Sequence, residues 1–209
     1  MMAIKNYEVF RRASRDVIHK IIDECLKPDQ LMKSAKLLGI VREDILVFNN
    51  EDETDILMDF ALNEYKEDDK NIITLFKEKV GGRKDYEKEI LGAMLSSYTS
   101  LFKITSVSPR EKFSLLRDLL NERQDLKLWD IGMSETAIPG FLIFIRLVPL
   151  KDAFMTSGIS FVFPPHLEKY LLRKYKKLSK KTDPARLSSE RFIFFFRQSR
   201  IDGLEVRFE

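Results

Sequence analysis

One stretch decides how this chain folds, residues 101–165: LFKITSVSPREKFSLLRDLLNERQDLKLWDIGMSETAIPGFLIFIRLVPLKDAFMTSGISFVFPP. Within it the hydrophobic pattern changes from the three-four spacing of helices to the alternation of strands. Apolar side chains alternate in 101–107 and 126–131, and 141–148 is the most hydrophobic run of the chain. The segment Ile138-Pro139-Gly140 separates two of these runs and suits a tight turn.

The pattern predicts five short strands. They are expected at 101–107, 113–120, 126–131, 141–148 and 153–163. Ser157-Gly158 indicates a bulge or kink in the last strand, and Pro164-Pro165 ends it. Residues 141–146 carry bulky side chains on both faces, which a closed or covered sheet can bury. We therefore expect a curled antiparallel sheet or a small barrel.

Helical patterns flank this β module on both sides. They predict helices at 7–26, 29–38, 51–65, 71–80, 85–98, 167–178 and 185–200. Asp29 is expected to cap the second helix and Gly39 to end it. Residues 44–48 indicate a short strand, 192–196 fit either a helix or a strand, and 204–208 could add an edge strand.

These elements predict an α+β protein. It has an N-terminal helical region (1–98), a small antiparallel five-stranded barrel-like sheet (99–165) and C-terminal helices (166–209) that pack on the sheet.

Composition narrows the class of protein. The chain has 209 residues, of which 44% are hydrophobic and 33% charged, as in soluble globular proteins. The longest apolar runs, such as 141–145, are far shorter than the roughly 20 residues that span a bilayer. The N-terminus lacks the apolar core of a secretory signal. We therefore expect a cytoplasmic protein with no membrane association.

The net charge of +3 hides an asymmetry along the chain. Residues 41–69 hold eleven acidic and two basic residues, whereas residues 166–209 hold twelve basic and six acidic ones. The acidic segment 51–69 could dock on the basic segment 166–181, within one chain or across a homo-oligomer.

The basic segment holds the best candidate binding site. Its cations and one interleaved aromatic residue are Lys169, Arg173, Lys174, Lys176, Lys177, Lys180, Lys181 and Tyr170. Clustered cations can neutralise several phosphates of a nucleic acid, although a solvated helix face has the same composition.

Catalytic candidates are few. Asp118, Asp130 and Asp152 lie near predicted strand ends, where carboxylates could act in a hydrolase or a metal-dependent enzyme, but aspartates there more often close turns. The two histidines, His19 and His166, have no partner at motif spacing. We expect no cofactor and no metal site.

One thiol and one aromatic side chain are further candidates for a functional role. Cys25, the single cysteine, faces an apolar stripe and is expected to be inert. Trp129 could be a stacking platform, or it could pack in a core or an interface.

Several short pieces of residues 50–165 carry a resemblance. They are Ile56-Leu57-Met58-Asp59-Phe60, Tyr98 with Leu101-Phe102-Lys103-Ile104, Leu116-Arg117-Asp118-Leu119-Leu120, Ile143-Phe144-Ile145-Arg146-Leu147-Val148-Pro149, Ser157-Gly158 and Phe161-Val162-Phe163-Pro164-Pro165. This pattern resembles uncharacterised bacterial proteins, some of which carry a zinc-binding SEC-C tail. That tail needs several cysteines, which this chain lacks, and the resemblance implies no catalytic residues.

The sequence thus favours a non-enzymatic cytoplasmic binding or adaptor protein. The alternatives are a nucleic-acid-associated regulator that uses the helix at 167–181 and an enzyme that uses the strand-end aspartates.

Overall fold

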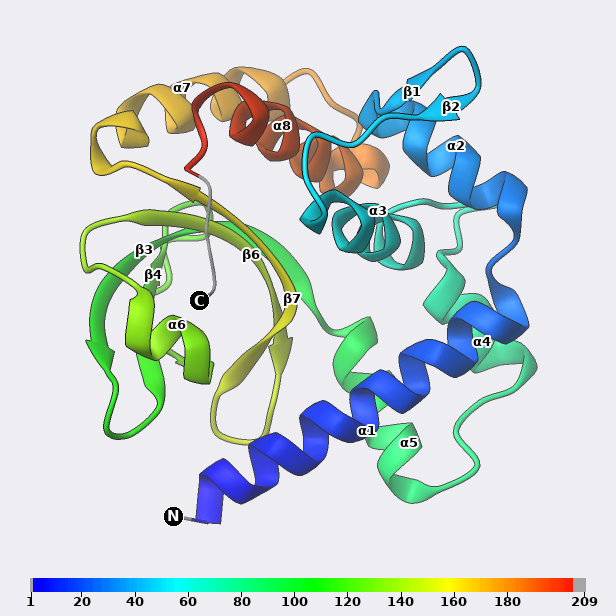
Figure 1. The fold of residues 1–209 in the computed structure, drawn as a ribbon, viewed down its shortest axis with the longest axis horizontal. Coiled ribbons are helices and arrows are strands. Elements are labelled where there is room, and N and C mark those ends of the chain that lie inside the picture. Colours follow the sequence, from blue (N-terminus) through cyan, green and yellow to red (C-terminus); the bar gives the residue numbers. More distant parts are fainter. Residues whose placement is uncertain (1, 205–209) are drawn as a thin grey trace. The chain divides into compact units, whose positions relative to one another are not determined.

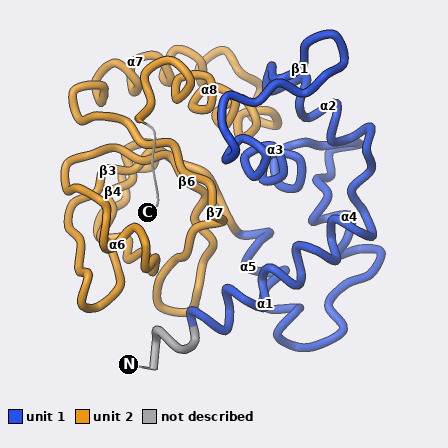
Figure 2. The backbone as a smooth tube through the Cα atoms, in the orientation of Figure 1, with its two compact units in different colours: residues 1–96 blue, residues 97–209 orange. Residues whose placement is uncertain are grey.

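The computed structural model describes the backbone of residues 2–204 and the side chains of residues 7–204 (Figure 1). It confirms the α+β class with a five-stranded, barrel-like sheet. The chain forms two compact units, residues 1–96 and 97–209, which are distinguished in Figure 2. The barrel and the C-terminal helices belong to the second unit.

The first unit is mainly helical. Its helices are α1 (Met2–Cys25), α2 (Pro28–Leu38), α3 (Asp52–Asn63), α4 (Ile72–Lys79) and α5 (Asp85–Leu95). The three-four spacing of apolar residues places Val17 and Ile21 of α1 against Phe76 of α4 and Ile90 of α5 in one buried cluster. The predicted helices are therefore confirmed, with small changes at their ends.

The start of α2 differs from the prediction. Its N-cap is Lys27 rather than Asp29, because Pro28 occupies the first helical position and Gln30 accepts a hydrogen bond from the Lys27 N–H at 3.0 Å. Gly39 ends the helix with a φ of 82°, as predicted. The predicted strand at 44–48 is shorter, since only β2 (Ile45–Leu46) forms and it pairs with β1 (Val41–Arg42).

The end of α5 also differs from the prediction. Residues up to Tyr98 were expected to be helical, but α5 ends at Leu95 and Tyr98 is the first residue of a barrel strand. Tyr86, near the start of α5, is 42% exposed. The aromatic and hydroxyl side chains that follow Leu95 suit a pleated strand, and they pair with another strand of the barrel.

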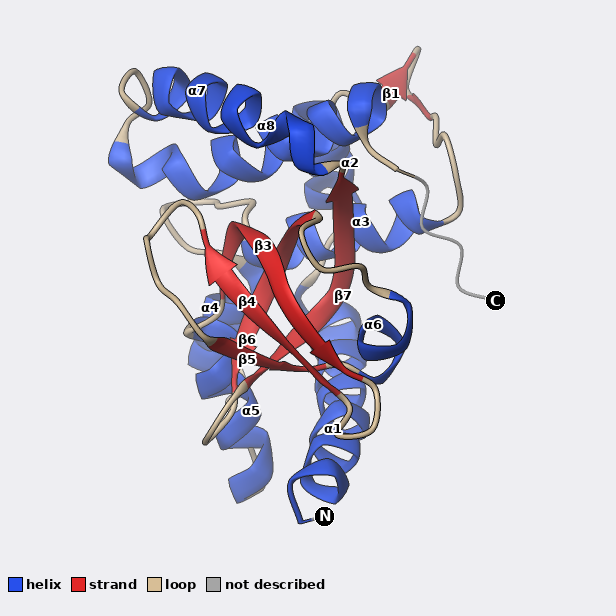
Figure 3. Cartoon of the chain, turned by 90° about the vertical axis from the view of Figure 1, so that its left-hand side faces the viewer, coloured by secondary structure: helices blue, strands red, loops and turns tan. Residues whose placement is uncertain are grey.

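The second unit is built on the barrel. Its strands are β3 (Tyr98–Ser108), β4 (Phe113–Asp118), β5 (Leu126–Trp129), β6 (Leu142–Pro149) and β7 (Phe154–Phe163), seen in Figure 3. Their order is β3-β4-β5-β7-β6, and β6 returns to pair with β3. All pairs are antiparallel except β5 with β7. That parallel pair has a single bridge, Leu128 with Phe154, so the ring closes through a narrow seam and the sheet is barrel-like.

Two irregularities bend the strands. The register of β3 against β4 shifts between Ile104 and Ser106. The register of β6 against β7 shifts opposite Ser157 and Gly158, where Gly158 has a φ of 119°. The predicted bulge at Ser157-Gly158 is thus confirmed, and both shifts increase the curvature that a small barrel needs.

The barrel interior is apolar. Its buried members are Phe102, Ile104, Leu116, Leu128, Ile143, Ile145 and Leu147. Met133 of a short helix, α6 (Ile131–Thr136), and its C-cap residue Ala137 pack against the same cluster. The sequence did not predict α6, because the alternation of 126–131 continues as far as Ile131. Asp130 instead ends the strand and caps α6 by accepting a hydrogen bond from the Met133 N–H at 2.9 Å.

Two helices complete the second unit. They are α7 (Glu168–Ser179) and α8 (Leu187–Asp202), each preceded by a single 3-10 turn. Residues 192–196, which fitted helix or strand, are helical. After α8 the chain makes one bridge, Leu204 with Val162, and the remainder of the edge strand predicted at 204–208 lies outside the described residues. In the part of the chain that is described, no helix is both long and apolar enough to cross a membrane.

Candidate functional site

One side of the barrel is covered by a helix. Phe144 of β6 stacks on Phe195 of α8 with ring centroids 4.5 Å apart, and Phe161 of β7 meets Phe192 of α8 edge to face at 5.8 Å. All four rings are at most 3% exposed. A polar contact also joins α8 to β3, because the Arg191 Nε donates to the Thr99 hydroxyl at 3.1 Å. This side of the barrel is therefore part of the core.

The opposite pair of strands presents its outward side chains to solvent. Alternation along β4 and β5 directs Ser114, Leu116 and Leu128 inward, where they are fully buried. The outward residues, which we call the open face, are Phe113, Leu115, Arg117, Lys127 and Trp129. All five are partly or fully exposed, and none of them is acidic.

An aromatic pair occupies one end of the open face. Phe113 and Trp129 are directly paired across β4 and β5, and their rings meet nearly edge to face at 5.9 Å and 70°. The Lys127 ammonium lies over both rings, 4.1 Å from the Phe113 centroid and 4.5 Å from the Trp129 centroid. The three side chains form a cation–π cluster on the barrel surface.

The second candidate surface is the predicted basic helix. On α7, Leu171 and Tyr175 point inward, and the Tyr175 ring contacts the Phe194 and Phe195 rings of α8. The opposite side carries the predicted cations. These seven, which with Tyr170 we call the basic face, are Lys169, Arg173, Lys174, Lys176, Lys177, Lys180 and Lys181.

The structure brings all members of the basic face together. All seven cations are exposed, and within residues 7–204 none of them has an acidic partner. Helical spacing arranges them in two adjacent rows. One row is Lys169, Arg173, Lys176 and Lys180, and the other is Tyr170, Lys174, Lys177 and Lys181. The Lys174 ammonium lies 5.5 Å from the Tyr170 ring centroid.

An ion pair connects the barrel to the start of α7. The Lys103 ammonium of β3 lies 3.0 Å from the Glu168 carboxylate in the first turn of α7. Lys103 is also the cross-strand partner of Arg117 on β4. The cationic end of the open face is therefore adjacent to the strand that anchors α7.

The three strand-end aspartates have separate surroundings. Asp118 is fully buried and accepts hydrogen bonds from the Ser100 hydroxyl at 2.5 Å and from the Leu120 and Asn121 N–H groups. Asp130 caps α6 and accepts a hydrogen bond from the Thr156 hydroxyl at 3.0 Å. Asp152 is exposed in the loop between β6 and β7.

The register of β4 and β5 keeps two of these carboxylates apart. Asp130 follows Trp129, which pairs with Phe113, while Asp118 lies at the other end of β4. Five residues of strand correspond to about 17 Å at about 3.4 Å per residue. No group of three His, Cys, Asp or Glu side chains with the geometry of a metal site occurs among the described residues. Asp118 and Asp130 thus act locally, as a turn residue and a helix cap.

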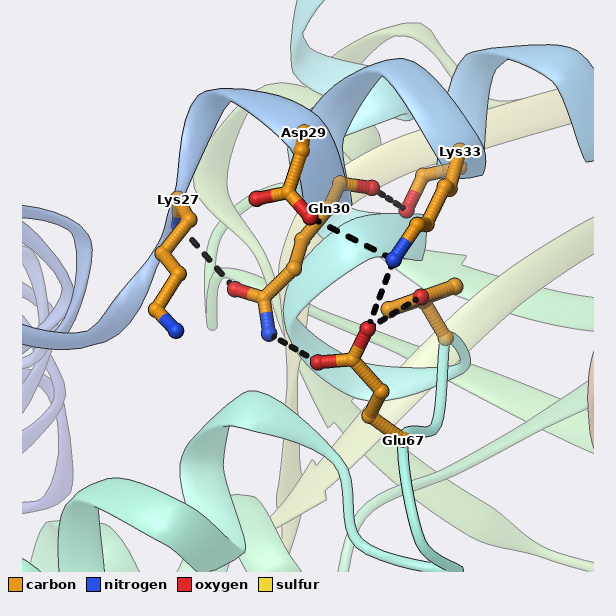
Figure 4. A network of polar contacts seen from close by, with 7 residues as sticks. Lys27, Asp29, Gln30, Lys33 and Glu67 are labelled. Atoms are coloured by element: carbon orange, nitrogen blue, oxygen red, sulfur yellow. Dashed lines mark hydrogen bonds and ion pairs between the residues drawn. The ribbon is translucent and has the colours of Figure 1, made fainter.

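Only some of the acidic side chains of segment 51–69 are exposed on the surface. Glu53, Asp59 and Glu64 are buried, and each has an interaction partner. Glu67 is held in a network with α2, shown in Figure 4: it accepts from the Gln30 amide at 2.9 Å, the Lys33 ammonium at 2.9 Å and the Tyr65 hydroxyl at 3.1 Å. These hydrogen bonds, led by that of Lys33, lower the pKa of Glu67 to about 2.

A small pocket in the first unit has a structural role. It has a volume of about 40 Å³, which suits a water molecule rather than a substrate. At its edge the Lys20 ammonium lies 2.5 Å from the Glu87 carboxylate, which also accepts from the Arg83 and Lys84 N–H groups. The hydrogen bond from Lys20 is the main reason that the pKa of Glu87 falls to about 2. Glu87 thereby fixes the start of α5.

The remaining residues that the sequence singles out are His19, His166 and Cys25. His19 and His166 are exposed. Cys25 packs against the apolar cluster of the first unit, and burial raises the pKa of its thiol. Neither histidine nor the thiol adds to the two candidate surfaces.

The whole chain matches the model of one protein family. Residues 1–209 match the model of a family of unknown function, DUF7986. The chain belongs to this family. No curated protein and no solved structure matches it. The match of this DUF7986 member agrees with the expectation of an uncharacterised family and carries no information on a SEC-C tail.

In the sequence Trp129 is a candidate by itself, and no motif connects it with Phe113, Lys127 or Arg117. The alternation of 126–129 does place Lys127 and Trp129 on one side of their strand. Their pairing with β4 depends on a hairpin register that the sequence does not state.

Proposed function

We propose that this DUF7986 member is a non-enzymatic binding protein that holds nucleic acid through the basic face of α7. One observation carries this proposal: five exposed cations of α7 and two more directly after its last residue form one face, and none of the seven has an acidic partner within residues 7–204. Cations without acidic partners can neutralise phosphates, and in doing so they release the counterions that are condensed on the nucleic acid. That release supplies the free energy of sequence-independent binding.

The topology of the barrel supports a nucleic acid as the ligand. Its order, β3-β4-β5-β7-β6 with a helix between the third and fourth strands, is the order of oligonucleotide/oligosaccharide-binding (OB) folds. Such folds bind oligonucleotides on the face of their second and third strands, which correspond here to β4 and β5. The likeness is one of fold alone, so it supports nucleic-acid binding only together with the charges of α7.

The burial of three acidic residues reduces the charge that segment 51–69 could offer to the basic face of a second copy of the chain. A homo-oligomer joining 51–69 to 166–181 would need exposed carboxylates on the first segment. Glu53, Asp59 and Glu64 are buried there, and Glu67 is paired with Lys33. The exposed acidic residues of the segment are Glu51, Asp52, Asp55, Asp68 and Asp69.

The proposal is tested by neutralising one row of the basic face, with Lys169→Gln, Arg173→Gln, Lys176→Gln and Lys180→Gln in one variant. Fluorescence anisotropy with a labelled 20-nucleotide strand measures affinity at several salt concentrations. We expect at least about tenfold weaker binding at low salt, and a salt slope smaller by up to about 3, because each lost phosphate contact removes about 0.7.

A matched control neutralises four exposed cations of the first unit, with Arg12→Gln, Arg15→Gln, Lys77→Gln and Lys79→Gln. We expect it to bind as the unaltered protein does. Equal weakening by both variants would reduce the effect to net charge and overturn the proposal. So would unchanged affinity of the α7 variant; a change in its sedimentation alone would favour the homo-oligomer.

A further inference from the structure

We propose that the open face of the barrel binds the unpaired bases of single-stranded nucleic acid, with Phe113 and Trp129 as the stacking platform and Lys127 and Arg117 as phosphate contacts. The inference takes its ligand class from the proposed function but assigns a second surface and a preference for single strands.

The aromatic pair has the properties of a stacking platform. Phe113 and Trp129 are partly exposed although the barrel interior is filled by other side chains, so the fold does not need them as core. Their position on adjacent strands fixes the two rings relative to each other. Stacking of a base on such a ring contributes about 1–3 kcal/mol and tolerates any sequence, because every base has a π face.

Lys127 suits the exchange that binding requires. Its ammonium lies over both rings, at 4.1 and 4.5 Å, in the place that a stacked base would take. An incoming base displaces the ammonium from the rings, and the flexible lysine stem lets it reach the phosphate that accompanies the base. The cation thus exchanges one electron-rich partner for another.

Charge complementarity extends along the strand. Arg117 lies four residues from Phe113 on the same side of β4, about 14 Å away at about 3.4 Å per residue. Its side chain is exposed, and no acidic partner occurs within residues 7–204. The open face therefore offers aromatic rings at one end and a free guanidinium at the other, which fits bases and phosphates of one strand.

The geometry favours single strands over duplexes. In a duplex the base faces are stacked on each other and only the edges and the backbone are accessible, whereas unpaired bases can splay onto aromatic side chains. The basic face of α7 can neutralise phosphates of either form. The preference for single strands is accordingly a property of the open face alone.

The test uses the single tryptophan of the chain as the reporter, because Trp129 is the only source of tryptophan fluorescence. The full chain is titrated with a 12-nucleotide oligothymidine and with a blunt 12-base-pair duplex. We expect the single strand to quench the emission in a saturable manner and the duplex to leave it nearly unchanged. Equal affinity for both forms with no change in emission overturns the inference.

Two variants assign the effect to residues. Phe113→Leu removes one ring but keeps an apolar side chain and the reporter, and Arg117→Gln changes an exposed side chain outside the packing. We expect Phe113→Leu to bind the single strand at least about fivefold more weakly, and Arg117→Gln about two- to fivefold more weakly. The matched control is Tyr86→Leu, an exposed ring in the first unit that also has a lysine, Lys84, over it.

The two proposals fail separately. If neutralising α7 weakens binding while Phe113→Leu and the Trp129 emission show no effect, the open face is not a site and the proposed function stands. If oligothymidine quenches Trp129 and Phe113→Leu weakens binding while the α7 variant binds normally, the open face is the site and α7 is a solvated helix. Loss of binding by Tyr86→Leu as well would count against the open face.

Discussion

The two outer sides of the barrel make different use of aromatic residues. On the covered side, Phe144 and Phe195 stack at 4.5 Å with no exposed surface. On the open face, Phe113 and Trp129 meet at 5.9 Å and remain partly exposed beneath a lysine. Where a helix covers the strands, aromatic residues build the core. Where the strands face solvent, they are available to a ligand.

The difference follows from what lies across from each ring. A buried aromatic side chain removes about 150–250 Å² from water and gains close contacts on all sides. A partly exposed ring gains much less, and a cation over it contributes about 0.5–1 kcal/mol at an exposed position. The covered side should therefore determine the free energy of unfolding, and the open face should contribute little to it.

The largest expected effect is on the covered side. Phe195→Ala removes a ring that contacts Phe144, Phe163 and Tyr175, and leaves a cavity between α8 and the barrel. We expect a loss of about 3–5 kcal/mol in the free energy of unfolding, measured by denaturant titration. A loss below about 1 kcal/mol would mean that α8 does not cover the barrel as described.

An intermediate effect is expected for Asp118, which lies on β4 but points away from the open face. Asp118→Ala leaves the buried Ser100 hydroxyl and the Asn121 amide without their acceptor. We expect a loss of about 2–3 kcal/mol in stability, with binding of oligothymidine unchanged once the variant is folded. Weaker binding without loss of stability would instead give Asp118 a role in the site.

The smallest expected effect is on the open face itself. Trp129→Leu should change the free energy of unfolding by less than about 1 kcal/mol, because the indole is partly exposed and the barrel interior does not include it. The same denaturant titration checks this, with Phe195→Ala as the reference. A loss comparable to that of Phe195→Ala would make Trp129 a core residue and remove the contrast between the two sides.

The sequence predicts the second unit well where its pattern has a single period. Alternation and apolar runs locate the barrel strands, the pair Ser157-Gly158 indicates the bulge, and three-four spacing locates α7 and its cations. Residues 192–196 are ambiguous for a physical reason. Phe192 and Phe195 of α8 face the barrel while Phe194 contacts Tyr175 of α7, so the helix is apolar on two sides and its pattern loses the helical period.

Other features depend on pairing that only the folded chain defines. Asp130 continues the alternation of its strand in the sequence. In the folded chain it caps α6 instead, because its carboxylate accepts a hydrogen bond from the Met133 N–H. The acidic residues Glu53 and Glu64 were counted as surface charge but are buried. Phe113, Lys127 and Trp129 form a cluster only because β4 and β5 pair in this register. The sequence alone does not predict that register, so it does not predict the contact.

The single bridge between β5 and β7 bears on how the barrel moves. A strand of four residues that is tied to one neighbour by one bridge can separate from it at a lower free energy than β6, which has long ladders on both sides. Amide hydrogens near Leu128 should exchange with deuterium sooner than those near Ile145. The barrel is therefore expected to open most readily between β5 and β7, beside Trp129. A nucleic-acid strand bound across β5 would hold these two strands together.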